Sequence, residues 1–397
     1  MKDLTKGKIS TLILGFAIPV FLGNLLQLTY SLVDTRIVGS FLGEDALAAV
    51  GATSTLSGLI IGFLLGLSNG FAIITAQKFG AKNIADMKKS FAMSLVIGTG
   101  ISILFTIAGL LFLKPILHFL NVPKHLVPVA KGYIAIIIAG LLATFLYDAC
   151  AATLRAIGDA VTPLIILAIS VALNIVGDLF FVVVLKTGVK GAAIATVLAQ
   201  IIAFVICWIY MIRKYEILRL QKEDFKDPSP IMVKEMISAG MSMGFMSSLV
   251  NIGSLTLQTA INKLGKDIII AHTAARKITE IFMIMFSVFG QTMATYCGQN
   301  MGAGKIDRVK RGIWLAIVYT AIWSGLTIIA SYTIGGWLVY LVTGSHNKTV
   351  ILNATNYLKF DTLFYIVTTL ICILRNAMQG LGDHITPLIS SGLEMAG

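Results

Sequence analysis

Long apolar runs recur along this chain from Thr11 almost to its last residue, and they restrict its fold more than any other feature. A helix needs about 20 apolar residues to cross a bilayer. Transmembrane strands instead alternate apolar and polar residues over about ten positions, and runs such as 134–145 do not alternate. The sequence therefore predicts an all-α polytopic membrane protein. Its approximate spans are 12–41, 47–77, 88–113, 127–155, 161–185, 190–212, 232–262, 268–298, 312–342, 352–379 and a last one from about 385.

Composition agrees with this prediction and excludes several classes of protein. Only 13% of the 397 residues are charged, against about 25% in soluble domains, which is too little to cover a water-soluble globule. The net charge of +12 comes from short loops that lack interleaved aromatic residues, so we expect no nucleic-acid partner. The four cysteines stand singly inside apolar runs and indicate neither disulfides nor a metal site. Since no phosphate-binding loop is visible, we expect neither an enzyme nor a cofactor.

An internal repeat divides the chain into two halves. The segment 77–82 returns as 299–305, an offset of 299 − 77 = 222, and the segment 158–165 returns as 382–389, an offset of 382 − 158 = 224. Each half should therefore hold six helices in the same order. Because six is an even number, both halves cross the bilayer in the same direction. This predicts two parallel repeats related by an axis along the membrane normal.

The repeat also predicts the domain boundaries. We expect an N-terminal lobe of six helices over 1–213, a cytoplasmic linker over 214–231 and a C-terminal lobe over 232–397, with a central cavity between the lobes. Since 397 − 224 = 173, the second repeat stops at the counterpart of Leu173, near the start of its fifth helix. The sequence thus predicts a C-terminally truncated second lobe. The chain is interpreted as a fragment, with a natural half-helix terminus as the alternative.

Basic residues predict the orientation in the membrane. With loops assigned alternately to the two sides, nineteen Lys and Arg residues lie on the side of the N-terminus and ten on the other, leaving out two inside the run 268–298. Loops rich in Lys and Arg remain in the cytoplasm. We therefore expect a monomeric, multi-pass protein of the cell (inner) membrane with a cytoplasmic N-terminus.

Ionisable side chains inside the predicted spans are the first candidates for a functional site, because each costs roughly 2.5–3.5 kcal/mol at bilayer depth. Asp34, Tyr133, Asp178 and Thr196 each lie six to eight residues from the outer end of a predicted helix. At about 1.5 Å per residue, all four fall roughly 9–12 Å below the outer edge. Asn174 lies one turn before Asp178 on the same helix face. We therefore expect these five side chains to form one shell.

Such a shell suits the binding of a small cation. Two carboxyl groups in one apolar pocket cannot both remain charged cheaply, which favours reversible binding of a proton. The oxygen atoms of Asp34, Asn174, Asp178 and Thr196 would also suit Na⁺. The alternative is that each group only caps a neighbouring helix or extends toward the interface.

The other charged side chains inside the spans fit structural roles. Asp148 lies two turns from Arg155, and Arg276 lies one turn from Glu280, so both are interpreted as ion pairs within a helix. Pro19 should bend the first predicted helix, because proline removes a helical hydrogen bond.

A substrate cavity has its own candidates. The methionine-rich stretch 241–246 would give an adaptable apolar surface, although ordinary helix packing explains it as well. The candidate substrate-cavity residues are Gln27, Tyr30, Met243 and Asp361.

Several motifs together resemble those of one transporter family. They are Leu32–Gly39 around Asp34, Gln77–Ala81 with its repeat Gln299–Ala303, Leu154–Pro163, Asn174–Asp178 and Gly188–Thr196. Together these motifs resemble the multidrug and toxic compound extrusion (MATE) family over the whole chain.

The resemblance implies twelve helices in two lobes arranged as a V around a central cavity. It implies export of cationic or amphiphilic drugs by antiport with H⁺ or Na⁺. In the DNA-damage-inducible (DinF-like) branch, which the chain resembles, the coupling cation binds in the N-terminal lobe. That motif falls on Asp34, Asn174, Asp178 and Thr196, with Tyr133 nearby, and a helix-1 proline corresponds to Pro19.

A second site, known in the sodium-dependent NorM-like branch, corresponds to Val250 and Thr368 and is expected to be absent. A lipid-linked oligosaccharide flippase of the same superfamily is the main alternative function. The cavity of such a flippase should be strongly cationic to hold a pyrophosphate group. Arg276 and Lys277 alone provide little positive charge for that purpose. A membrane receptor or scaffold without transport is a third possibility, and it predicts no dependence on protons or sodium.

Overall fold

The computed structural model describes residues 3–120, 122–261, 265–344 and 347–396, which form helices and no strand. The helices of the first half are α1 (Ile9–Leu42), α2 (Glu44–Gly80), α3 (Ile84–Leu111), α4 (Leu113–Phe119), α5 (Val127–Ala139), α6 (Leu141–Ala156), α7 (Val161–Asp178), the π-helix η1 (Leu179–Val184) and α8 (Val189–Lys214). Two 3₁₀ turns, η2 (Glu216–Leu218) and η3 (Lys222–Phe225), follow. The helices of the second half are α9 (Pro230–Ile261), α10 (Lys266–Gly302), α11 (Ile306–Thr333), α12 (Gly335–Thr343), α13 (Lys348–Leu363), α14 (Tyr365–Leu381) and α15 (Ile385–Ala396).

Each predicted apolar run coincides with one helix or with two consecutive helices. Among the described residues, seven helices are long and apolar enough to cross a membrane. The pairs α5–α6 and α13–α14, bent by 44° and 50°, raise this number to as many as nine. The prediction of an all-α polytopic membrane protein is confirmed.

Corresponding helices break at corresponding positions in the two halves. The bend between α5 and α6 falls at Gly140 and that between α13 and α14 at Phe364, an offset of 364 − 140 = 224. The breaks after α3 and α11 fall at Phe112 and Ile334, an offset of 334 − 112 = 222. These are the offsets of the sequence repeat, so the repeated sequence specifies repeated three-dimensional structure.

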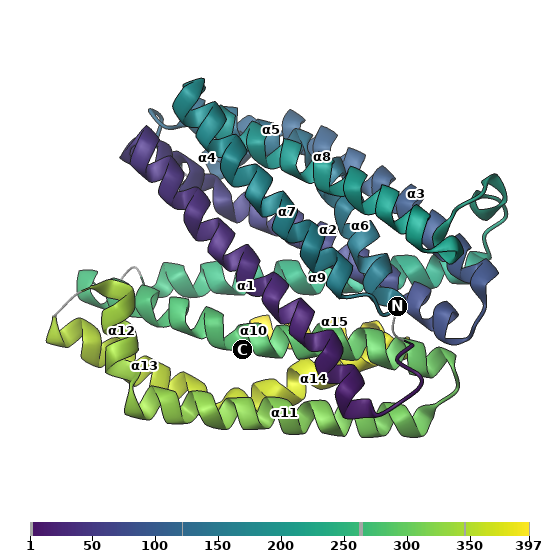
Figure 1. The fold of residues 1–397 in the computed structure, drawn as a ribbon. Coiled ribbons are helices and arrows are strands. Elements are labelled where there is room, and N and C mark those ends of the chain that lie inside the picture. Colours follow the sequence, from purple (N-terminus) through teal and green to yellow (C-terminus); the bar gives the residue numbers. More distant parts are fainter. Residues whose placement is uncertain (1–2, 121, 262–264, 345–346, 397) are drawn as a thin grey trace.

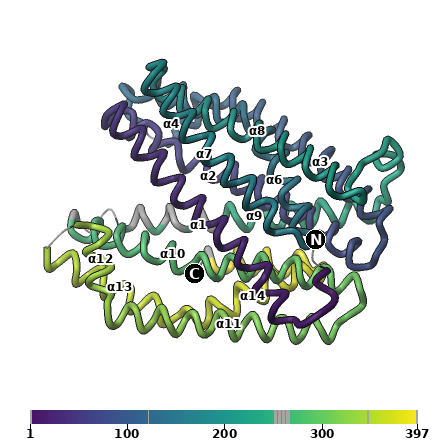
Figure 2. Tube along the Cα trace, viewed as in Figure 1, coloured from purple at the N-terminus to yellow at the C-terminus, as the bar shows by residue number. Residues whose placement is uncertain are grey.

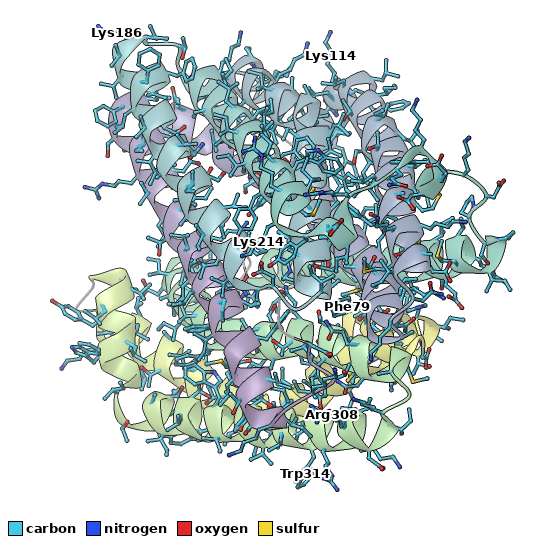
Figure 3. The ribbon with its side chains drawn as sticks, turned by 45° about the vertical axis from the view of Figure 1, so that its right-hand side comes forward. Phe79, Lys114, Lys186, Lys214, Arg308 and Trp314 are labelled. Atoms are coloured by element: carbon cyan, nitrogen blue, oxygen red, sulfur yellow. The ribbon has the colours of Figure 1, made fainter. Side chains whose placement is uncertain are left out.

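The helices form two lobes that diverge from one end (Figure 1). The lobe of α1–α8 and the lobe of α9–α15 lie close together at the end that carries the N-terminus and the connection from α8 to α9. They are separated at the end that carries α4 and α12, and Figure 2 shows the same arrangement along the Cα trace. Lys114 and Lys186 project from the end of the first lobe that lies far from Arg308 (Figure 3).

At their close end the lobes meet through two glycines of the repeated motif. A Cβ atom added to Gly80 of α2 would lie 1.9 Å from the backbone oxygen of Gln299, and one added to Gly302 of α10 would lie 1.9 Å from that of Gln77. Both approaches involve backbone atoms, which cannot rotate out of the way. Only glycine therefore permits this contact between α2 and α10.

The two glutamines of the same motif bind the opposite lobe. Gln77 Nε2 donates to the carbonyl oxygen of Gly380 at 2.9 Å, and Gln299 Nε2 donates to that of Ala156 at 2.6 Å. Since 380 − 156 = 224, the two bonds are related by the repeat. The motif that identifies the repeat in the sequence is thus an interlobe contact in the structure.

The N-terminal segment before α1 is tied into this junction. Leu4 is 1% exposed, and its backbone N–H donates to Gln299 Oε1 at 3.0 Å. Lys305 Nζ donates to the carbonyl oxygen of Thr5 at 2.7 Å, and Arg308 donates to that of Gly7 at 3.0 Å. The N-terminal half of α1 then packs with α10 and α11, and the helix also packs along α7, where Gly23 approaches Leu167. Helix α1 therefore spans both lobes.

Gly80→Ala should destabilise the chain, because the new methyl group meets the Gln299 backbone. Overpacking of this kind costs about 1–3 kcal/mol, so the thermal midpoint of the detergent-purified protein should fall by several degrees. Gly100→Ala is the matched control, since a Cβ atom there meets nothing within 4 Å. A helical glycine replaced by alanine in open space should be neutral or stabilising. Equal midpoints for the two variants would contradict the close approach of α2 and α10.

Candidate functional site

A cavity of about 510 Å³ lies in the first lobe and reaches α10 of the second. Helix α1 lines it with one face, because its lining positions follow one another at helical spacing. These α1 residues are Pro19, Gly23, Gln27, Tyr30 and Asp34, which are separated by three or four positions. The other polar lining residues are Ser31, Asn24, Ser54, Ser57, Tyr133, Thr144, Tyr147, Asp148, Arg155, Thr196, Gln200 and Gln291.

Two carboxyl groups from separate helices meet beside this cavity. Asp34 of α1 lies in its lining, and Asp178, the last residue of α7, is 0% exposed. Their carboxyl groups lie within hydrogen-bond reach of each other. Among the described residues, neither Asp34 Oδ1 nor Asp178 Oδ1 has another hydrogen-bond partner. Because a carboxylate can only accept, this contact requires a shared proton or another cation.

Neutral oxygen and nitrogen atoms complete the shell. In the amide orientation that satisfies its neighbours, Asn174 Nδ2 donates to Asp178 Oδ2 at 3.0 Å and to the Tyr30 hydroxyl at 3.3 Å. Its Oδ1 then accepts from the backbone N–H of Thr196 at 3.0 Å. The Thr196 hydroxyl lies 3.4 Å from that of Tyr30. The structure thus brings Asp34, Asn174, Asp178 and Thr196 together.

Small residues allow α7 and α8 to approach closely enough for this. A Cβ atom added to Gly177 of α7 would lie 3.0 Å from Ala195 Cβ of α8, and one added to Gly191 of α8 would lie 2.9 Å from Phe181 Cβ of η1, which continues α7. These contacts place Thr196 of α8 opposite Asn174 of α7. Directly after Asp178 the chain continues as the π-helix, a form that is frequent at functional sites. The apolar run 161–185 gave no sign of this change in helix type.

Two tyrosines lie near the shell, and only one of them, Tyr30, contacts its residues. Tyr133, named from the sequence as a shell member, lines the cavity and packs against Val38, Ala46 and Val182. Within the described chain, no hydrogen bond joins its hydroxyl to either carboxyl group. Tyr30, named only as a cavity residue, instead contacts Asn174 and Thr196. Its position one turn before Asp34 was the sequence signal that could have placed it in the shell.

The remaining candidates lie in different places. Pro19 and Gln27 line the cavity, and α1 continues through Pro19 as one helix, so the bend there stays a prediction. Met243 lines a smaller space of about 20 Å³ between the lobes, together with Arg155 and Gln291. Asp361 lies in the second lobe and accepts from the Tyr365 hydroxyl at 3.0 Å, so its cavity role also stays a prediction.

Of the two ion pairs expected within helices, that of Asp148 with Arg155 does not form a direct contact within the described residues, and that of Arg276 with Glu280 stays a prediction. Arg155 donates to Asn69 Oδ1 of α2 at 3.3 Å, and the described chain shows no ion pair within 4.0 Å between Asp148 and Arg155, although the two charges still attract each other over a longer distance. Seven residues span about 10.5 Å of helix, too far for a short aspartate to hold the arginine. Glu280 binds Lys277, three residues before it, at 3.1 Å.

The second cation site, expected to be absent, corresponds to Val250 and Thr368. The side chain of Val250 lies outside the described part of the chain, so this expectation stays a prediction.

Oxygen ligands for Na⁺ are available in the shell, from Asp34, Asp178, Asn174 and Thr196. The described residues contain no group of three or more His, Cys, Asp or Glu side chains that could hold a metal ion. The donor set therefore fits a proton or a monovalent cation held by two carboxyls and neutral oxygens.

The MatE family model matches residues 19–180 and 242–396, which cover both lobes and every residue of the shell except Thr196. The chain belongs to the MatE family. It is 29% identical to "Probable multidrug resistance protein YpnP" of Bacillus subtilis, over 98% of this chain and 86% of that protein. It is 25% identical to "DNA damage-inducible protein F" of Escherichia coli, over 83% of this chain and 70% of that protein.

Solved MATE structures share the fold of this MatE chain. A chain described as the outward-facing conformation of a multidrug resistance MATE family transporter of the MOP superfamily superposes with a TM-score of 0.90. It is 22% identical, covering 98% of this chain and 87% of that chain. A MOP superfamily transporter from Pyrococcus furiosus, described as having a binding pocket of reverse polarity, gives the same TM-score and identity, over 98% and 86%.

The start of α7, which carries Asn174 and Asp178, is fixed by a repeated capping motif. Asp159 Oδ1 accepts from the backbone N–H of Thr162 at 3.0 Å, and its Oδ2 accepts from the Thr162 hydroxyl at 2.6 Å and the Tyr215 hydroxyl at 2.5 Å. In the second half, Asp383 Oδ1 accepts from the backbone N–H of Thr386 at 3.1 Å. Burial acts to raise the pKa of Asp159, but the bonds from Thr162 and Tyr215 outweigh it and lower that pKa below 3.8.

Asp159→Ala should therefore lower the free energy of unfolding by about 1–2 kcal/mol at neutral pH, as loss of a helix cap does. Since the folded-state pKa is lowered, this contribution is complete above the unfolded-state value and is lost as the pH falls through the folded-state value. Thermal midpoints measured across pH should show the difference from wild type closing in acid. Glu235→Ala, at an exposed position of α9, should change little at any pH. A difference that persisted in acid would contradict the cap.

Proposed function

We propose that this MatE protein is a secondary active multidrug efflux transporter that exports cationic or amphiphilic compounds by antiport with H⁺ or Na⁺. The observation that carries the proposal is the contact between the carboxyl groups of Asp34 and Asp178 beside a large cavity. The printed names of relatives support it, since YpnP is described as a probable multidrug resistance protein and MepA of Staphylococcus aureus as a multidrug export protein. The likeness to DNA damage-inducible protein F favours the DinF-like branch.

The coupling cation binds at the carboxyl pair. One proton shared between Asp34 and Asp178 satisfies both acceptors, whereas Na⁺ would bind both carboxylates with the oxygens of Asn174 and Thr196. When the cation leaves, two negative charges face each other in an apolar surrounding and repel. The repulsion separates the outer part of α1 from the end of α7, since these are the two elements that carry the acids.

Helix α1 links cation binding to the cavity. Asp34 shares one helix face with Tyr30 and Gln27, so a displacement of Asp34 also moves side chains that line the drug space. The inner half of the same helix packs against the second lobe through Ile13 and Phe16. A change at the carboxyl pair can thus alter both drug affinity and the contact between the lobes.

Alternating access requires the close end of the V to open. The bonds of Gln77 to Gly380 and of Gln299 to Ala156 must break, together with those that hold the N-terminal segment. One charge that moves inward through 100 mV supplies about 2.3 kcal/mol. Such a cation drives more than a tenfold drug gradient.

We place the closed end on the cytoplasmic side of the cell (inner) membrane. The basic residues Lys78, Lys214, Lys305 and Arg308 flank loops at that end, as expected of cytoplasmic loops. The protein is proposed to act as a monomer, with each chain carrying its own cavity and carboxyl pair.

The charges of the cavity argue against the flippase alternative. Its charged lining residues are two acids, Asp34 and Asp148, and one base, Arg155. A pyrophosphate-linked lipid carries several negative charges and requires a strongly basic lining. The cavity is instead matched to cationic and neutral compounds.

Asp34→Asn and Asp178→Asn should each abolish coupled efflux, because an amide lacks the negative charge that binds the coupling cation. Efflux of ethidium from proteoliposomes, driven separately by a proton gradient and by a sodium gradient, measures this and identifies the ion. The rate should fall at least tenfold in both variants at wild-type protein levels.

Asp45→Asn is the matched control, an exposed acid at the start of α2 that lies outside the cavity. It should transport at the wild-type rate. Gradient-driven efflux that survived in both the Asp34 and the Asp178 variants would rule out the carboxyl pair as the coupling site.

A further inference from the structure

Over the described residues, the lining of the large cavity stops at the level of the carboxyl pair on four helices of the first lobe. On α1 the last lining residue is Asp34, and on α2 the first one is Ser54. On α5 and α8 the first lining residues are Tyr133 and Thr196. Helix α1 runs toward the end of the lobe that carries α4, whereas α2, α5 and α8 run away from it (Figure 1). These four residues therefore mark the same end of the cavity.

One helical turn beyond that level, each of these helices carries an apolar residue, and so does the π-helix after Asp178. The pairs of polar and apolar residues are Asp34 and Val38 on α1, Ser54 and Val50 on α2, Tyr133 and Val129 on α5, Thr196 and Ala192 on α8, and Asp178 and Val182 where α7 continues as η1. In all five pairs the two residues are four positions apart. Each apolar side chain thus lies on the same helix face as its polar partner, one turn nearer the end of the lobe.

These apolar side chains pack together into a cluster that we call the apolar seal. Its members are Val38, Ala46, Val182, Val189 and Ala192, with Val50 and Val129 packed against them. The five buried members are 0% to 7% exposed. Beyond the seal lies the end of the lobe from which Lys186 projects (Figure 3). The carboxyl pair therefore has the cavity on one side and the apolar seal on the other.

An ion cannot cross a cluster of this kind without losing its water. The transfer of an isolated charge into apolar surroundings is very costly, and apolar constrictions in membrane proteins close ion paths because they expel water. Asp34 lines the cavity, so a cation can reach the carboxyl pair from that side. The apolar seal leaves no comparable path from the end of the lobe.

We propose that the apolar seal closes the outer side of the carboxyl pair, so that the coupling cation enters and leaves only through the cavity that the exported compound also uses. This inference rests on the proposed efflux function and assigns the route of its cation. When the cavity faces the cytoplasm, the seal separates the carboxyl pair from the outside. Val38 and Val182 do not bind the cation, and their role is to keep water and ions away from Asp34 and Asp178 on that side.

Ion leak through the reconstituted 397-residue chain tests the seal. Val182→Ser replaces a buried seal residue by a smaller polar one that admits water. In proteoliposomes without drug, an imposed H⁺ or Na⁺ gradient should collapse about tenfold faster than with the wild type, because an inward-facing cavity then has a wet path to the outside. Val184→Ser is the matched control, on the same π-helix but 66% exposed, and should leak as little as the wild type. Equal leak from the two variants would overturn the inference.

The leak should also pass through the carboxyl pair. Adding Asp34→Asn and Asp178→Asn to Val182→Ser should return the leak to the wild-type level, since the cation then has no binding site between the seal and the cavity. A leak that persisted in the triple variant would show a general loss of packing and would contradict the proposed route.

Thiol labelling tests the seal without transport, and it remains available if Val182→Ser does not fold. Val182→Cys keeps a small apolar side chain at the same position. A membrane-impermeant thiol reagent added to intact cells should leave it unmodified and should modify Lys186→Cys at the exposed end of the lobe, once labelling of the wild type is subtracted. Modification of both variants at the same rate would overturn the inference. A wild-type chain without ion-driven efflux would instead refute the proposed function.

Discussion

Two carboxyl groups that touch in an apolar surrounding need a cation between them, and the rest of the first lobe is arranged to make that contact. Asp34 and Asp178 come from two separate helices that pack side by side, and Asn174 and Thr196 supply the neighbouring polar atoms. The approach of α8 to α7 and η1 depends on Gly177 and Gly191, which leave room for it. Neither acid could occupy its position alone without a large cost in desolvation. We therefore propose that occupancy by a cation and the conformation of α1 are linked.

Helix α1 carries that linkage across the molecule. Its C-terminal half holds Asp34 and lines the cavity, while its N-terminal half and the segment before it are bound to the second lobe. The contact between the lobes is itself repeated, because Gln77 and Gly80 in one lobe correspond to Gln299 and Gly302 in the other. A pseudo-symmetric contact of this kind holds the close end shut by two equivalent sets of bonds. Opening must break both sets together, which favours a two-state motion over gradual bending.

Most of the fold could be predicted from the sequence, because apolar runs and a repeat with offsets of 222 and 224 residues determine the helices and their order. The grouping of Asp34, Asn174, Asp178 and Thr196 followed from counting residues from helix ends, since rise per residue is constant. Side-chain direction could not be predicted in this way. Arg155 was expected to bind Asp148 and instead binds Asn69 of a different helix. The π-helix after Asp178 also has no signal in an apolar run, because both helix types bury the same residues.

We propose that one monovalent cation binds at the carboxyl pair and leaves when a drug binds. The most direct measurement counts H⁺ and Na⁺ released as ethidium saturates the purified chain in weakly buffered solution, with a pH indicator and a sodium electrode. We expect release of about one cation per chain and none from an Asp34→Asn/Asp178→Asn double variant. Stoichiometric drug binding by the wild type without release of either ion would contradict it.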